Sequence, residues 1–191
     1  MKSHISEFAT VDAVLATKAN TCGVDAFALS VIKAERQIRK LFTHLVFQMP
    51  AFGPSDVQAL RKALAENRDV YFEGFIAGWD ALYPRPMSGL VGQEYQRLLA
   101  RLRQATGHRN KIFHGQLTTS NLSSGDLLSF VGDIRSWCSG LADGATAEIG
   151  YDGFGRNSFH KSAVAGLSVR HKSQFASIAD YEAFIHAHME R

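Results

Sequence analysis

The chain has 191 residues, of which 46% are hydrophobic and 20% charged, with a formal net charge of +3. This composition is typical of one globular domain and excludes long disorder and two full-sized domains. The mild positive charge is compatible with a phosphate-rich partner but does not predict one. No run approaches the roughly 20 apolar residues of a membrane span, and the N-terminus lacks a signal-peptide pattern. We therefore expect a cytoplasmic protein without membrane contact.

The two cysteines, Cys22 and Cys138, lie far apart in the sequence. Their spacing is that of neither a metal site nor a redox motif, so we expect two reduced thiols. We expect no metal and no other cofactor.

The first strong helix prediction covers residues 25–48. Its apolar residues recur at steps of three and four, which indicates one buried face: Phe27, Val31, Ala34, Ile38, Leu41 and Leu45. Two prolines and a glycine at 50–54 end this helix, and Ser55 is the predicted N-cap of the next. The apolar pattern over 57–82 is interrupted near 67–69, which indicates one long helix or two short ones.

A third helix is predicted to start after Ser88 and to continue past Ala105. The fourth follows Ser123 and Asp126, whose spacing predicts a capping box. Its apolar stripe includes Cys138, which should therefore face the core. These two helices complete the part of the chain with clear helical periodicity.

Beyond residue 142 glycine, serine and aromatic residues replace the helical pattern, and Asp152-Gly153 is a candidate turn for a short hairpin. A last helix is predicted over 177–189. We thus predict an all-α protein: an antiparallel four-helix bundle over 1–142, and an irregular C-terminal flap with an extra helix over 143–191, packed on the same domain.

The flap interleaves aromatic and basic residues, a pattern that can bind single-stranded nucleic acid. It can equally cover an apolar face of the bundle, which is the interpretation we favour. The residues concerned are Tyr151, Phe154, Arg156, Phe159, His160, Lys161, Arg170, His171 and Lys172.

The stretch RNKIFHG, residues 109–115, closes the third helix. Gly115 suits the left-handed backbone that ends many helices. Arg109 falls on the apolar stripe, and because a guanidinium is costly to bury alone, we expect an anion or a carboxylate beside it. Asn110 and His114 are four residues apart and share a helix face, so a hydrogen bond between them can orient the imidazole.

Two other Arg and His pairs have the same spacing, Arg39/His44 and Arg103/His108. We place His44 and His108 on solvated helix faces, which argues against a catalytic role for either pair.

An R-N-x-x-x-H-G ending on the third helix of a small bundle, with a long charged first helix before it and a fourth helix after it, resembles the HEPN superfamily. The resemblance covers residues 25–142, and its specific part is 109–115. Many members are metal-independent ribonucleases of toxin and defence systems, and others are inactive modules that bind nucleotides or partners. The resemblance implies an endoribonuclease with Arg109, His114 and Asn110 as catalytic residues.

Cutting RNA without a metal needs a base for the 2′-hydroxyl, an acid for the leaving oxygen and positive charge at the phosphorus. Since each chain supplies one His114, we expect a two-fold dimer with a shared cleft, as the resemblance also implies. Lys111 is expected to attract the substrate. Glu35 and Arg36 are expected to support the site, although an ordinary ion pair is the favoured role for both. The expected partners are RNA, a second copy, and an antitoxin or nucleotidyltransferase.

Two alternatives stay open. The chain can be a non-catalytic HEPN module that binds a nucleotide or a partner such as a minimal nucleotidyltransferase. It can also be an unrelated helical interaction protein in which RNKIFHG is only a helix ending. Intact Arg109 and His114 favour the enzyme over the inactive module.

Overall fold

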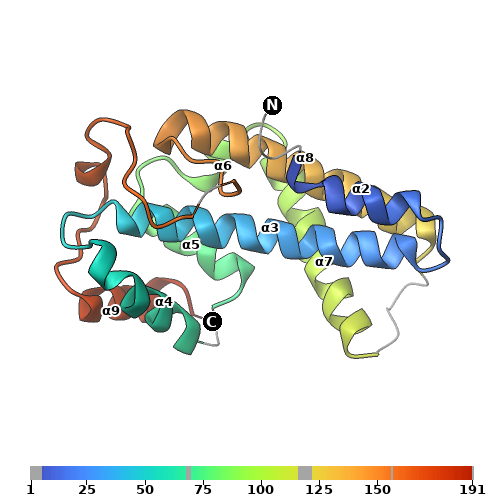
Figure 1. The fold of residues 1–191 in the computed structure, drawn as a ribbon, viewed down its shortest axis with the longest axis horizontal. Helices are drawn as coiled ribbons and strands as arrows, with labels where there is room; N and C mark the ends of the chain where they lie inside the picture. The colour runs from blue at the N-terminus through green and yellow to red at the C-terminus, as the bar shows by residue number, and fades with distance from the viewer. Residues whose placement is uncertain (1–5, 68–69, 116–121, 156, 191) are drawn as a thin grey trace.

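The computed structural model describes residues 6–67, 70–115, 122–155 and 157–190, and its regular structure there is helical (Figure 1). These ranges contain no strand, only an isolated antiparallel bridge between Val70 and Glu190. The all-α prediction is thereby confirmed. The elements are α2 (Ala9–Ala16), α3 (Cys22–Phe47), α4 (Val57–Glu66), α5 (Phe72–Leu82), α6 (Met87–Val91), α7 (Tyr95–Phe113), α8 (Ser124–Ile149) and α9 (Ile178–His188), with 3-10 turns at Pro54–Asp56 and Leu167–Val169.

The long helices α3 and α8 form the centre of the molecule and lie side by side (Figure 1). α3 also packs against α2, α5 and α7, while α6 and α7 pack against α8. The apolar stripe predicted for α3 is buried throughout, and Cys138 of α8 is buried with it. Both cysteines are free thiols, as expected. No helix in the described ranges is long and apolar enough to cross a membrane.

The boundaries of the middle helices differ from prediction. Residues 57–82 form two helices, and Ser55 is not the N-cap, because Pro54 begins a 3-10 turn in which Asp56 Oδ2 accepts a hydrogen bond from the Gly53 N–H at 2.8 Å. The expected third helix is divided at Gly92, whose φ of +89° no continuous helix allows. α7 therefore begins only at Tyr95.

The fourth helix begins as predicted, with the Ser123 hydroxyl accepting from the Asp126 N–H at 3.1 Å. Its predicted end at 142 is wrong, because α8 continues to Ile149 and stops at Gly150, which has φ +73°. Ala145 and Ile149 extend the buried stripe by two turns. The irregular segment thus starts at residue 150.

The segment after α8 covers the C-terminal end of α3. Lys161 Nζ donates to the carbonyl oxygens of Phe47, Met49 and Phe52 at 2.6 to 3.0 Å, and His171 Nε2 lies 2.9 Å from the Leu45 carbonyl oxygen. These contacts join the segment to the last turn of α3 and to the residues that follow it. The covering role of this segment is confirmed.

Tyr151 and Phe154 are buried in the same segment, and Asp152 forms no hairpin with Gly153: its Oδ1 accepts from the Phe154 N–H at 2.9 Å. Arg156 lies outside the described residues. The last helix is as predicted, since the Ser177 hydroxyl accepts from the Asp180 N–H at 3.2 Å.

The solvated positions predicted for His44 and His108 are wrong. His44 is 0% exposed, with Nδ1 3.0 Å from the Ser158 carbonyl oxygen and its ring against Tyr151 and His160. The C-terminal segment covers this face of α3, which helical periodicity alone does not reveal. His108 is half-buried with its ring centroid 5.5 Å from that of Phe130, and burial lowers the pKa of its imidazole.

Candidate functional site

The RNKIFHG stretch forms the last turns of α7, which project from the α3 and α8 pair (Figure 1). The helix ends as predicted: Gly115 has φ +64°, and its N–H donates to the Ile112 carbonyl at 3.1 Å. The His114 N–H donates to the Asn110 carbonyl at the same distance. This backbone bond is the contact that links Asn110 to His114.

Arg109 has the acidic partner that the sequence predicted. Its side chain is 18% exposed, and Nη2 donates to Glu35 Oε1 on α3 of the same chain. Burial raises the pKa of the Glu35 carboxyl, and the Arg109 guanidinium offsets part of that rise. Arg109 Nε is buried without a hydrogen-bond partner in the structure as described. The ion pair joins the projecting end of α7 to the middle of α3.

A cleft of about 490 Å³ opens beside this ion pair, between α3, the start of α5 and α7. Its floor includes aromatic residues at the start of α5. One further ion pair crosses it, between Arg103 Nε and Glu73 Oε1 at 2.7 Å. The charged and amide residues that line the cleft are Glu35, Arg39, Glu73, Arg103, Arg109 and Asn110.

The structure brings three of the predicted site residues together at this cleft, Arg109, Asn110 and Glu35. His114 is exposed at the C-cap of α7 and does not line it. Lys111, which is half-buried, also lies outside the lining. Arg36 lies on another face of α3, where it forms an ion pair with Glu7 at 3.6 Å. A single protomer therefore does not gather all the predicted residues in one cavity.

Sequence reasoning did not assign Arg39, Arg103 or Glu73 to the site. Arg39 lies one turn after Glu35 on α3, where the sequence suggests a pair within the helix. In the structure Glu35 pairs with Arg109 instead, and the Arg39 guanidinium lies 5.1 Å from the Phe75 ring centroid. The spacing of four residues between Glu35 and Arg39 was the feature of the sequence that could have assigned Arg39 to the site.

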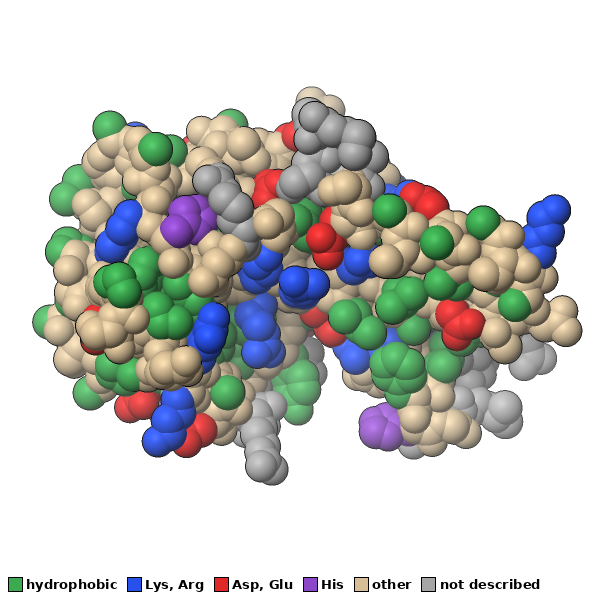
Figure 2. Space-filling view, viewed as in Figure 1, with side chains coloured by type: hydrophobic (Ala, Val, Ile, Leu, Met, Phe, Trp, Pro, Cys, Tyr) green, Lys and Arg blue, Asp and Glu red, His purple; other side chains and the backbone are tan. Residues whose placement is uncertain are grey.

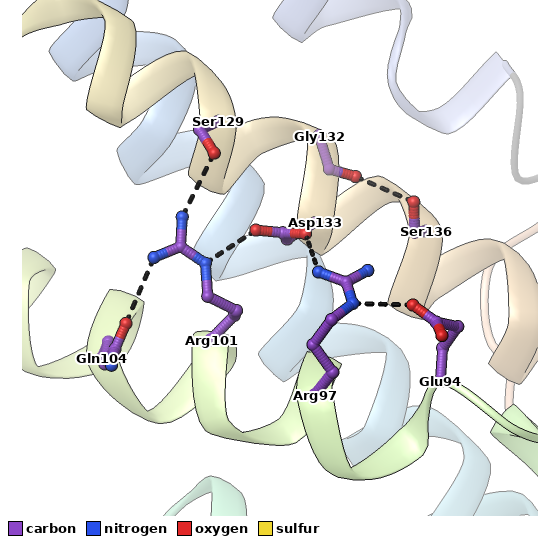
Figure 3. Close-up of polar contacts among 8 residues, drawn as sticks. All are labelled: Glu94, Arg97, Arg101, Gln104, Ser129, Gly132, Asp133 and Ser136. Atoms are coloured by element: carbon purple, nitrogen blue, oxygen red, sulfur yellow. Dashed lines mark hydrogen bonds and ion pairs between the residues drawn. The ribbon is translucent and has the colours of Figure 1, made fainter.

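Interhelical ion pairs fix the position of α7 on α8 (Figure 3). Arg97 and Arg101 hold the two carboxylate oxygens of Asp133 at 2.6 and 2.7 Å. Burial raises the pKa of the Asp133 carboxyl, but the hydrogen bonds from the two guanidinium groups lower it by more, so the net pKa is below its usual value. Arg101 also donates to the Ser129 hydroxyl at 3.2 Å. These two arginines thus anchor the helix that carries the motif.

Comparison of the chain with models of protein families, with curated proteins and with solved structures finds no match. The resemblance to the HEPN superfamily thus rests on residues 109–115 at the end of α7 and on the helices that precede and follow α7 in the chain.

Removing Arg109 alone is expected to destabilise the protein by about 1–3 kcal/mol, because Glu35 would remain a partly buried carboxylate without a partner. In a double-mutant cycle of Arg109→Met and Glu35→Gln, we expect a favourable coupling energy of at least about 1 kcal/mol by urea unfolding. The matched control is Lys62 and Glu66 on α4, which are 72% and 65% exposed. Their coupling should stay below about 0.5 kcal/mol. Equal coupling energies for the two pairs would contradict this expectation.

Proposed function

We propose that the protein is a metal-independent endoribonuclease of HEPN type that acts as a two-fold dimer. One observation carries the proposal: Arg109 is held by Glu35 beside an open cleft, and His114 is exposed at the end of the same helix. In this proposal α3, the α4 and α5 pair, α7 and α8 correspond to the four helices of the HEPN bundle.

In the proposed reaction the 2′-hydroxyl oxygen attacks the adjacent phosphorus and the 5′-oxygen of the next nucleotide leaves. His114 of one protomer accepts the 2′-hydroxyl proton, and the partner's His114 gives a proton to the leaving oxygen, since imidazole can do either near neutral pH. Arg109 supplies fixed N–H donors to the charged phosphorane. Asn110 is expected to help position these groups, and Lys111 to attract the phosphate backbone. The products are a 2′,3′-cyclic phosphate and a 5′-hydroxyl.

The donors of Arg109 support this assignment. Glu35 accepts a hydrogen bond from Nη2, while the buried Nε has no partner in the described part of the chain. A buried N–H without a partner costs free energy, so Arg109 keeps one donor that Glu35 does not satisfy. Glu35 then acts as a positioning residue that fixes the guanidinium before the substrate arrives.

The surroundings of His114 support the dimer. Phe113, the residue before it, is 57% exposed, and the Arg109 guanidinium lies 5.7 Å from its ring centroid. A second chain packed on this end of α7 would cover Phe113 and bring two imidazoles to one cleft. The proposal therefore requires a particle of twice the 21.0 kDa chain mass.

The decisive experiment incubates the purified protein with total RNA in EDTA and analyses the new ends. The proposal requires cleavage in EDTA with 2′,3′-cyclic phosphate and 5′-hydroxyl products. Products with 3′-hydroxyl ends, or cleavage that strictly requires magnesium, would rule it out. Growth arrest on expression, relieved by a neighbouring antitoxin, would support a role as a toxin or defence effector.

A non-catalytic module is the second candidate. The observation that favours it is the absence of His114 from the cleft that Arg109 and Asn110 line. Such a module would bind a nucleotide or a partner such as a nucleotidyltransferase, and wild-type protein and the His114→Ala variant would then both leave RNA intact.

A further inference from the structure

A second cleft, of about 520 Å³, lies between α3, α4 and the residues 154–155 and 157–159. Four cationic side chains line it, Arg36, Arg39 and Lys40 from α3 and Arg61 from α4. The lining residues include no carboxylate. Such an excess of positive charge at one hollow favours an anionic ligand.

The four cations differ in their partners. Arg36 pairs with Glu7 at 3.6 Å, and Lys40 donates to the Phe154 carbonyl. Arg39 and Arg61, in contrast, form no ion pair with any residue that the structure describes. Both are exposed on their helices. Glu35, the carboxylate that acts on Arg39 through charge alone, is already paired with Arg109.

Aromatic rings hold these two guanidinium groups in place. Arg61 lies 5.0 Å from the ring centroid of Phe159, and Arg39 lies 5.1 Å from that of Phe75. A guanidinium stacked on a ring keeps its N–H edge available for phosphate and loses less side-chain freedom on binding. Burial and the nearby charge of Arg36 also lower the pKa of Lys40. An anion in the cleft would relieve this crowding of positive charge.

The two clefts share a residue. Arg39 lines both the basic cleft and the cleft that contains Arg109. Figure 2 shows Lys and Arg side chains gathered in the middle of one face of the molecule, with Asp and Glu side chains beside them. Glu35 and Glu73 also line the Arg109 cleft, but the cations of the two clefts together suit a ligand with repeated phosphates better than a single phosphate group.

We propose that the basic cleft binds the phosphate backbone of single-stranded RNA, with Arg39 and Arg61 as the principal contacts, and passes the strand along α3 to Arg109. This inference rests on the proposed ribonuclease function, because it gives the second cleft the same substrate. The basic cleft is an additional binding site, because none of residues 109–115 lines it.

Binding of a fluorescent, fully 2′-O-methylated oligonucleotide tests the proposal, because this RNA lacks the attacking hydroxyl and cannot be cleaved. Arg39→Gln with Arg61→Gln is expected to weaken binding at least tenfold in anisotropy titrations. It should also reduce the slope of log K against log salt by about 1.4, that is about 0.7 for each lost phosphate contact. Unchanged melting temperatures are expected, since both side chains are exposed.

The matched control is Lys62→Gln, which removes one charge from α4 outside the cleft at a side chain that is 72% exposed. It should change the affinity less than twofold. If Lys62→Gln weakens binding as much as Arg61→Gln alone, only general surface charge is involved and the proposal fails. It also fails if ATP displaces the oligonucleotide at equal phosphate concentration, because the cleft would then serve a small nucleotide.

The His114→Ala variant separates this inference from the proposed function. The basic cleft predicts that this variant binds the methylated RNA as wild type does. Normal binding without cleavage of ordinary RNA by wild type would overturn the ribonuclease proposal alone. Cleavage that is unaffected by Arg39→Gln with Arg61→Gln, together with unchanged binding, would overturn the cleft proposal alone.

Discussion

Replacing His114 by alanine is expected to slow RNA cleavage by about 100- to 10,000-fold, the usual contribution of a general acid or base. The melting temperature should stay unchanged, because His114 is exposed at the C-cap of α7 and a backbone N–H makes its bond to Asn110. The measurement is the single-turnover rate on a short RNA in EDTA. Loss of activity with an unchanged fold would assign His114 to the chemistry.

His108→Ala is the matched control, since this histidine lies on the same helix and also follows an arginine by five positions. It is half-buried against Phe130, so its removal is expected to lower stability and to leave cleavage within about threefold of wild type. Arg109→Lys should lower the rate, because lysine keeps the charge but loses the planar fork of donors. Full activity of His114→Ala would reduce RNKIFHG to a helix ending.

Gly144→Ala is expected to destabilise the protein by about 1–3 kcal/mol, because it overpacks the contact between α8 and α6. An added Cβ would lie 2.2 Å from the Leu90 carbonyl oxygen and 2.8 Å from its carbonyl carbon. Both are backbone atoms, so relief requires α6 to move. Urea unfolding measures the loss.

Gly132→Ala on the same helix is the control with the opposite sign. An added Cβ there meets nothing within 4 Å, so the gain in helix propensity should stabilise the protein by about 0.5–1 kcal/mol. Similar effects of the two substitutions on stability would show that α6 can move away at little cost. This would contradict the prediction for Gly144→Ala.

Local features of the fold could be predicted from the sequence because neighbouring residues determine them. The buried stripe of α3 follows from helical spacing, and the capping boxes at Ser123 and Ser177 follow from side chains three residues apart. The end of α8 could not, since Gly144 looks like a helix breaker yet lies inside the helix where α6 approaches. Nor does helical periodicity reveal the close approach at Gly74 on α5, where an added Cβ would lie 2.1 Å from the Met189 carbonyl oxygen.

The candidate site divides in the same way. By itself the sequence determined that Arg109 is inward-facing and needs an anion or a carboxylate beside it, because burying an unpaired guanidinium is too costly, and that Gly115 ends the helix. Only the tertiary structure decided that the partner is Glu35, 74 residues away, and that His114 stays outside the cleft. It alone placed Arg39 and Arg61 of two different helices around one hollow. Helical periodicity records which face of a helix is buried, whereas the neighbour that covers it depends on how distant segments pack.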